Sequence, residues 1–148
     1  MTGLFDERTG GLVTYWKSIS AITTLVGSGT SARIYPHRAK EKAALPYIEY
    51  LRGGGQSERH HGGVSGMRLS LVYVYCNGAT LAAADALAEA VRGNTANYRG
   101  DMSGVYVNRV YCDDALDDGV DEPIDKSYTP KYWTRVIFRI AHAEAVGV

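Results

Sequence analysis

The sequence predicts a two-layer α+β domain with a mainly antiparallel sheet of four to five strands and two helices packed on one face. Two segments carry apolar residues at helical spacing, and several others alternate with the period of two that is typical of strands. In the last of these, Thr134, Val136, Phe138 and Ile140 alternate with a mixed and charged set. A sheet with one apolar face is typical of antiparallel strands covered by helices on a single side. The 148 residues, 45% of them hydrophobic, are enough for one domain over residues 1–148.

The N-terminal part predicts a flexible lead over residues 1–10 and then an amphipathic helix. The helix is indicated by apolar side chains spaced three and four residues apart, namely Leu12, Tyr15, Trp16, Ile19, Ile22 and Val26. Gly27 follows where a C-terminal cap is expected, so we expect the helix to end there.

The next segments predict a short extended piece, two strands and a long connection between them. Residues 33–36 end in a proline, residues 47–52 form a strand, and the strongest strand pattern covers residues 67–76. Between the two strands, residues 53–66 contain six glycines and almost nothing to bury. We therefore expect a mobile hairpin loop at 53–66 that becomes ordered against a partner.

The second half predicts a helix and two further strands. Leu81, Ala84, Leu87, Ala88 and Val91 mark the helix, and Arg92 followed by Gly93 indicates its end. Strands are expected over residues 104–112 and 132–142. They are joined by an acidic loop at 113–131, and residues 113–125 of that loop hold seven of the sixteen acidic residues.

Charge and hydropathy exclude several classes of function. Sixteen basic residues balance sixteen acidic ones, so the chain lacks the basic excess of nucleic-acid binders. The longest apolar run, Leu71–Cys76, is far shorter than the roughly 20 residues of a membrane span. Residues 1–8 carry charge where a signal peptide would be apolar, so we expect synthesis in the cytoplasm and no membrane partner. Eleven tyrosines against two phenylalanines favour a protein that associates.

No motif for catalysis, metal or cofactor binding is present, so we expect no enzyme, no metal and no cofactor. An EF-hand alignment on Gly119 fails because Leu116 falls at a ligand position. His60 and His61 lack the partners that a zinc site needs, and Cys76 and Cys112 are interpreted as free thiols. An enzyme could still combine His142 with a loop aspartate.

The order of elements resembles the tail-completion proteins, or tail terminators, of long-tailed bacteriophages, prophages and gene transfer agents. The resemblance lies in the N-terminal helix, the segments 33–36 and 45–50, the glycine-rich hairpin, the strand 68–77, the alanine-rich stretch 83–92, the strand that precedes Asp113 and Asp114, and the last strand 133–141. It covers roughly residues 12–142. An additional lead before the first helix and an unusually acidic loop depart from the family pattern.

The resemblance implies a virion structural protein located in the tail at the head–tail interface and assembled in the host cytoplasm. Subunits of that family form a homo-oligomeric ring, typically a hexamer, that caps the tail tube protein, terminates tail polymerisation and joins the head-completion or connector protein. DNA passes only through the channel, and we expect the acidic loop to border it, where like charge discourages sticking. The candidate interface residues lie in the two loops: Gly53, Gly54, Gly55, Arg59, His60, His61, Asp113, Asp114, Asp117 and Asp118.

Three alternatives stay open at this point. The first is another connector ring, such as a head-closure protein, built on a similar small α+β unit. The second is an RNA-binding α+β module that stacks bases on Tyr47 or Trp133. The third is a small enzyme, which no motif supports.

Overall fold

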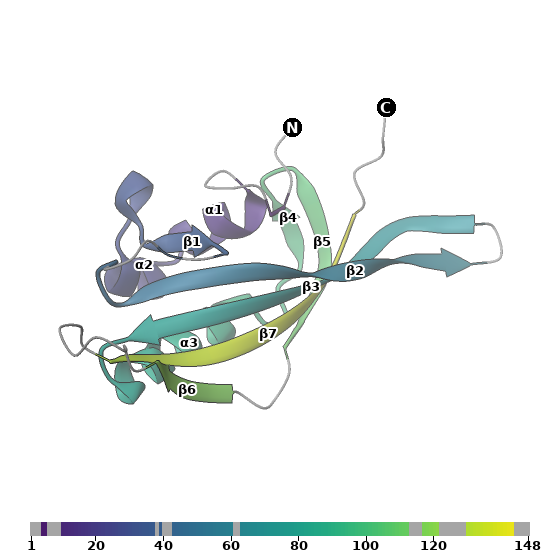
Figure 1. The fold of residues 1–148 in the computed structure, drawn as a ribbon. Helices are drawn as coiled ribbons and strands as arrows, with labels where there is room; N and C mark the ends of the chain where they lie inside the picture. Colours follow the sequence, from purple (N-terminus) through teal and green to yellow (C-terminus); the bar gives the residue numbers. More distant parts are fainter. Residues whose placement is uncertain are drawn as a thin grey trace.

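The computed structural model describes residues 4–5, 10–37, 39, 43–60, 63–112, 117–121 and 130–143 (Figure 1). Over these residues it is an α+β fold, as predicted, with three α-helices and a 3-10 turn, which are α1 (Gly11–Lys17), α2 (Ser20–Val26), η1 (Gly29–Ser31) and α3 (Leu81–Thr95). The strands are β1 (Ile34–Pro36), β2 (Tyr47–His60), β3 (Gly63–Gly78), β4 (Gly100–Met102), β5 (Val105–Cys112), β6 (Asp117–Asp121) and β7 (Lys131–Ala143).

The seven strands in the described part of the chain belong to one sheet in the order β1-β2-β3-β7-β5-β4, with β6 paired to β7 off this path. β1 runs parallel to β2, and the other pairs are antiparallel. β5 pairs with residues 138–142 of β7 and β6 pairs with residues 131–135. Because β3 occupies the other edge of β7, β5 and β6 follow one another along a single edge of that strand.

The core lies between the helices and one face of the sheet (Figure 1). Val72, Val74 and Cys76 of β3 and Phe138 of β7 are fully buried, and so is Trp16 of α1. The alternation of side chains along these strands places the residues between them on the opposite face, which carries no helix in the part of the chain that the structure describes. The predicted two layers and the helix-covered face are therefore present.

The sheet is larger and more mixed than the predicted four to five strands. β4 and β6 were not expected, because three residues around a turn and a run of acidic residues carry little strand signal. The parallel pairing of β1 with β2 was also not expected, because the short segment 34–36 gives no indication of its direction.

The first helix differs from the prediction because it is broken in two. Ile19 between α1 and α2 has an extended backbone, with φ −95° and ψ 113°. The Ser18 hydroxyl donates to the Tyr15 carbonyl oxygen at 2.6 Å, a local bond that competes with continued helix. The predicted stripe still packs inward, with Leu12, Trp16 and Ile22 fully buried, so the break redirects the helix without exposing its apolar face.

The helix α3 begins as expected but ends later than Arg92. The Thr80 hydroxyl caps its first turn by accepting from the Ala83 N–H at 3.1 Å. At the other end, the Trp16 ring N–H donates to the Thr95 hydroxyl at 3.0 Å, and the Tyr15 hydroxyl donates to the Asn94 carbonyl. These tertiary bonds stabilise a last turn beyond Gly93 that the local sequence did not predict.

The segment 53–66 is not the loop that we expected. β2 continues to His60 and β3 starts at Gly63, so their ladder extends to the pair His60 and Gly63, with irregularities on the way. Backbone hydrogen bonds between facing strands do not depend on side-chain burial. The glycine content, which indicates little burial, therefore led to the prediction of a loop where the structure has two paired strands. Residues 61–62 and the side chains of 54–66 lie outside the described residues, and the mobility of the segment stays a prediction.

The lead over residues 1–10 is also only partly as expected. Leu4 is buried, and its carbonyl accepts from the Leu12 N–H at 3.0 Å. The Phe5 ring lies edge-on to His142, with 5.8 Å between the centroids. These two residues therefore belong to the packed domain because their apolar side chains cover the start of α1 and the end of β7. Most of the other lead residues lie outside the description.

Candidate assembly surface

The face of the sheet opposite the helices, which we call the open face, carries a continuous set of large side chains. Its members are half-buried rather than exposed, and come from β2, β3 and β7: Leu51, Leu69, Leu71, Tyr73, Tyr75, Trp133 and Ile137. The rings of Tyr75 and Trp133 lie edge to face with centroids 5.6 Å apart. Arg135 sits on the same face, 5.8 Å from the Tyr73 ring centroid. Aromatic rings interleaved with arginine are typical of protein interfaces.

The open face is hollowed at one end by an open pocket of about 470 Å³. Its apolar wall is formed by Leu51, Tyr75 and Trp133. Its polar wall is formed by His37, Glu49, Asn77, Asp121 and Lys131. The pocket thus brings two carboxylates and two aromatic rings together where β2, β3, β6 and β7 meet.

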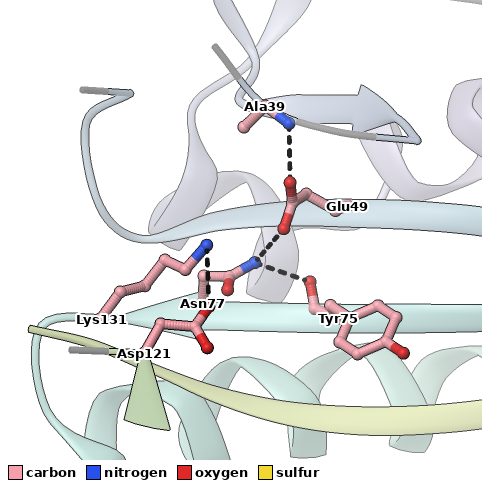
Figure 2. Close-up of polar contacts among 6 residues, drawn as sticks. All are labelled: Ala39, Glu49, Tyr75, Asn77, Asp121 and Lys131. Atoms are coloured by element: carbon pink, nitrogen blue, oxygen red, sulfur yellow. Dashed lines mark hydrogen bonds and ion pairs between the residues drawn. The ribbon is translucent and has the colours of Figure 1, made fainter. Parts of the chain in front are cut away.

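Glu49 is the most buried charged group of this pocket, with 9% of its surface exposed (Figure 2). One carboxylate oxygen accepts from the Ala39 N–H at 2.7 Å, and the other accepts from the Asn77 side-chain amide at 3.1 Å. The same Asn77 nitrogen also donates to the Tyr75 carbonyl at 3.2 Å. Since a carboxylate offers about four lone-pair sites, these two bonds leave Glu49 capacity for a further donor.

Lys131 closes the pocket from the start of β7 (Figure 2). Its ammonium nitrogen lies 3.5 Å from an Asp121 carboxylate oxygen and 5.6 Å from the centroid of the Tyr47 ring. Burial lowers the pKa of Lys131, but the Tyr47 hydroxyl and the charges of Glu49 and Asp121 outweigh burial and raise it. Lys131 is therefore cationic at neutral pH and partly offsets the two carboxylates.

The acidic loop contributes the edge strand β6 to this end of the molecule. Asp117 and Asp118 are exposed, and the Asp117 carboxylate pairs with the Arg135 guanidinium. Gly119 packs closely against the Trp133 indole. A Cβ added at this position would lie only 2.5 Å from the indole carbon Cζ2. Of the predicted loop interface, Asp117 and Asp118 are thus on a strand, while Asp113 and Asp114 lie outside the described residues.

The predicted hairpin interface forms the other end of the molecule. We call residues 53–66 the arm; in Figure 1, β2 and β3 extend there beyond the rest of the sheet. Gly53, Gly54, Gly55, Arg59 and His60 lie on β2, and His61 lies outside the described residues. At the root of the arm, Gly53 is required by close packing, since a Cβ would meet the Tyr73 ring at 2.4 Å.

The two predicted parts of the interface do not come together within one chain. Met67 is the last residue of β3 that pairs with β7 on the arm side, whereas Tyr75 pairs with Arg135 beside β6. Eight residues of strand separate these positions, which is about 26 Å at 3.3 Å per residue. The arm and the acidic strand therefore occupy opposite ends of the sheet.

Of the side chains considered for other chemistry, His142 and Tyr47 are buried, whereas Trp133 is half-buried on the open face. His142 is 7% exposed and one ring nitrogen lies 2.7 Å from the Ser70 hydroxyl, while Asp117 lies at the far end of β7. Tyr47 is 5% exposed, so its ring is not available to stack on a base.

Among the described residues, no three His, Cys, Asp or Glu side chains are grouped to hold a metal ion. None of the helices that the structure describes has the length and hydropathy to span a bilayer.

The pocket was not predicted, although the sequence carries one signal for it. Glu49 stands between Tyr47 and Leu51 on the same strand face, where a period-two pattern predicts an apolar residue. A charged residue at such a position indicates a buried polar partner, here Asn77 from the neighbouring strand. Nothing in the sequence identified that partner, because the register between the two strands brings it there.

Comparison with known proteins finds a similarity in fold to a solved structure. No protein-family model and no curated protein sequence matches this chain. Among solved structures, the fold is similar to that of a chain from the virion of a native gene transfer agent particle, with a TM-score of 0.53 and 15% sequence identity. The match covers 84% of this chain and 86% of that chain, so the similarity extends over most of both chains. At this identity the similarity is one of fold alone.

Proposed function

We propose that this protein is a structural component of a phage-type virion and that it acts as a tail terminator. In this role, copies form a ring, typically hexameric, that caps the tail tube, stops its polymerisation and offers a docking surface to the head connector. DNA only passes through the channel, and the protein has no enzymatic activity. The observation that supports the proposal is the similarity in fold, over 84% of this chain, to a chain of a gene transfer agent virion.

The surface of the chain supports a role in assembly. The open face presents half-buried aromatic and aliphatic side chains that no helix covers within the described residues. Beyond Met67 and Ser57, the arm strands pair only with each other in the described part of the chain. A two-stranded ribbon is marginal on its own, so both features favour contact with other subunits.

The test is the mass of the purified protein in solution, followed by negative-stain imaging after tail tubes are added. We expect rings, or caps on tube ends. A variant in which residues 54–65 are replaced by an Asn-Gly turn should keep the wild-type circular dichroism spectrum and lose the caps. Rings that bind the isolated head connector but leave tube ends bare would instead indicate a head-closure protein. A monomer that binds neither would contradict the proposal.

A further inference from the structure

The arm and the pocket of one chain are too far apart to meet. The arm leaves the sheet at Met67, and the pocket is centred about 26 Å back along β3, at Tyr75. The arm also runs away from the pocket, since the described part of β3 beyond Met67 continues the same strand outward (Figure 1). Any contact between these two features must therefore join different copies.

The arm brings positive charge to its end of the molecule. Between residues 52 and 68 the sequence has three arginines, two histidines and a single glutamate. Arg52 already lies over the Phe5 ring, 5.1 Å from its centroid, and Arg68 has partners within its own chain. Arg59, one position before the end of β2, is the arginine placed farthest from the body of the subunit.

The pocket has the opposite character and suits a guanidinium group. Glu49 is nine-tenths buried and has no ion pair among the described residues, although its carboxylate lines the pocket. Trp133 and Tyr75 add ring faces and edges, and arginine combines bidentate bonds to a carboxylate with stacking on aromatic rings. On the adjoining strand β6, Asp117 is paired with Arg135 and Asp121 with Lys131, while the exposed Asp118 adds negative charge that would attract a basic arm.

We propose that the arm of one copy docks against β6 of a second copy, with the Arg59 guanidinium in the pocket beside Glu49 and Asp121. The contact uses two different patches, so it is heterologous and generates a closed ring or an open filament. Only the closure of the ring rests on the proposed function; the contact between arm and pocket does not depend on it. The recognition itself depends on charge. Lys131 already pairs with Asp121, so the two carboxylates of the pocket keep one negative charge in excess, and the carboxylate of Glu49 is the one that the arm's arginine would neutralise.

Cross-linking of mixed variants tests the contact directly. One protein carries His60→Cys and the other Val120→Cys, so that Arg59, Glu49 and Asp121 stay in place, both in a Cys112→Ser background that leaves only the buried Cys76. A short bis-maleimide should link the two proteins when they are mixed, with or without tail tubes, and should not link an Arg99→Cys control to Val120→Cys. The absence of the 60–120 link under both conditions would overturn the proposal.

Charge exchange provides the second measurement, by sedimentation over a range of protein and salt concentrations. Arg59→Glu and Asp121→Arg should each weaken self-association by about 30-fold, and the double variant should recover about tenfold or more. Arg99→Glu, on the far edge of the sheet, should leave association unchanged. Single variants that associate like wild type, or a double variant with no recovery, would contradict the contact.

The two proposals can fail separately. Caps on tail tubes without the 60–120 link would preserve the terminator function and exclude this arm contact. The link without caps on tubes would preserve the contact and exclude the terminator function.

Discussion

Replacing Asn77 by aspartate should destabilise the protein strongly at neutral pH and much less at pH 5. The side chain is 1% exposed, and its amide nitrogen lies 3.1 Å from a Glu49 oxygen. The substitution keeps the shape but puts two carboxyl groups in contact. If both stayed ionised, their repulsion at 3.1 Å would be about 5 kcal/mol at an effective dielectric constant of about 20.

Uptake of a proton by one of the two carboxyl groups costs less free energy than keeping both ionised, so the cost of protonation sets the size of the destabilisation. Protonating a carboxyl with an ordinary aspartate pKa of about 3.9 costs about 4 kcal/mol at pH 7 and about 1.5 kcal/mol at pH 5, at about 1.36 kcal/mol per pH unit. The folded variant then holds a proton that the unfolded chain releases, so its stability rises as the pH falls. The protonated group can donate to Glu49 and replace the lost amide bond.

Urea denaturation of wild type and Asn77→Asp at pH 5 and pH 7 measures the effect. The difference in unfolding free energy between the two proteins should shrink by about 2.5 kcal/mol on acidification. Asn97→Asp is the matched control, because its side-chain oxygen accepts from Arg109 at 3.2 Å and gains a favourable charge. A penalty for Asn77→Asp that is equal at both pH values would refute the buried Glu49–Asn77 pair.

Four further predictions concern the core, the thiols and two glycines. Phe138→Ala removes a fully buried ring and should lower the free energy of unfolding by about 3–5 kcal/mol in urea titrations. A thiol reagent should label one group per native chain, at Cys112, because burial raises the pKa of Cys76; two labels on the native protein would contradict its burial. Gly119→Val should displace the Trp133 indole, shift its fluorescence and weaken self-association. Gly93→Ala should instead raise the midpoint temperature of unfolding, because an added Cβ has open space there and alanine favours the helix. A lower midpoint would contradict the open space at Gly93.

The sequence predicted those elements whose burial follows a simple period. Alternation in residues 132–142 correctly separated Val136 and Phe138 from the open face, and the helical stripe correctly placed Trp16 in the core. The prediction failed where pairing rather than burial determines the structure. β6 consists of acidic residues and glycine with one valine, and it is a strand because its backbone pairs with β7.

The candidate site was predictable only in part for the same reason. Glycine content and charge identified the arm and the acidic segment as candidate contact regions. Their positions at opposite ends of the sheet depend on the register of β3 against β7, which no local pattern specifies. The pocket depends on register as well, since Glu49 faces Tyr75 across one ladder while Asp121 faces Lys131 across another.

The separation of arm and pocket also explains why a small domain would carry a poorly supported hairpin. If the two features met within one chain, the arm would be satisfied in the monomer and would contribute nothing to assembly. Because the described arm strands extend past the last β3–β7 pair, at Met67 and Ala143, their edges remain open for another copy. Acidic side chains along β6 disfavour pairing with most exposed strands and favour a basic one. In the proposed contact, charge therefore selects the partner, and the distance between the two ends requires that this partner be a different subunit.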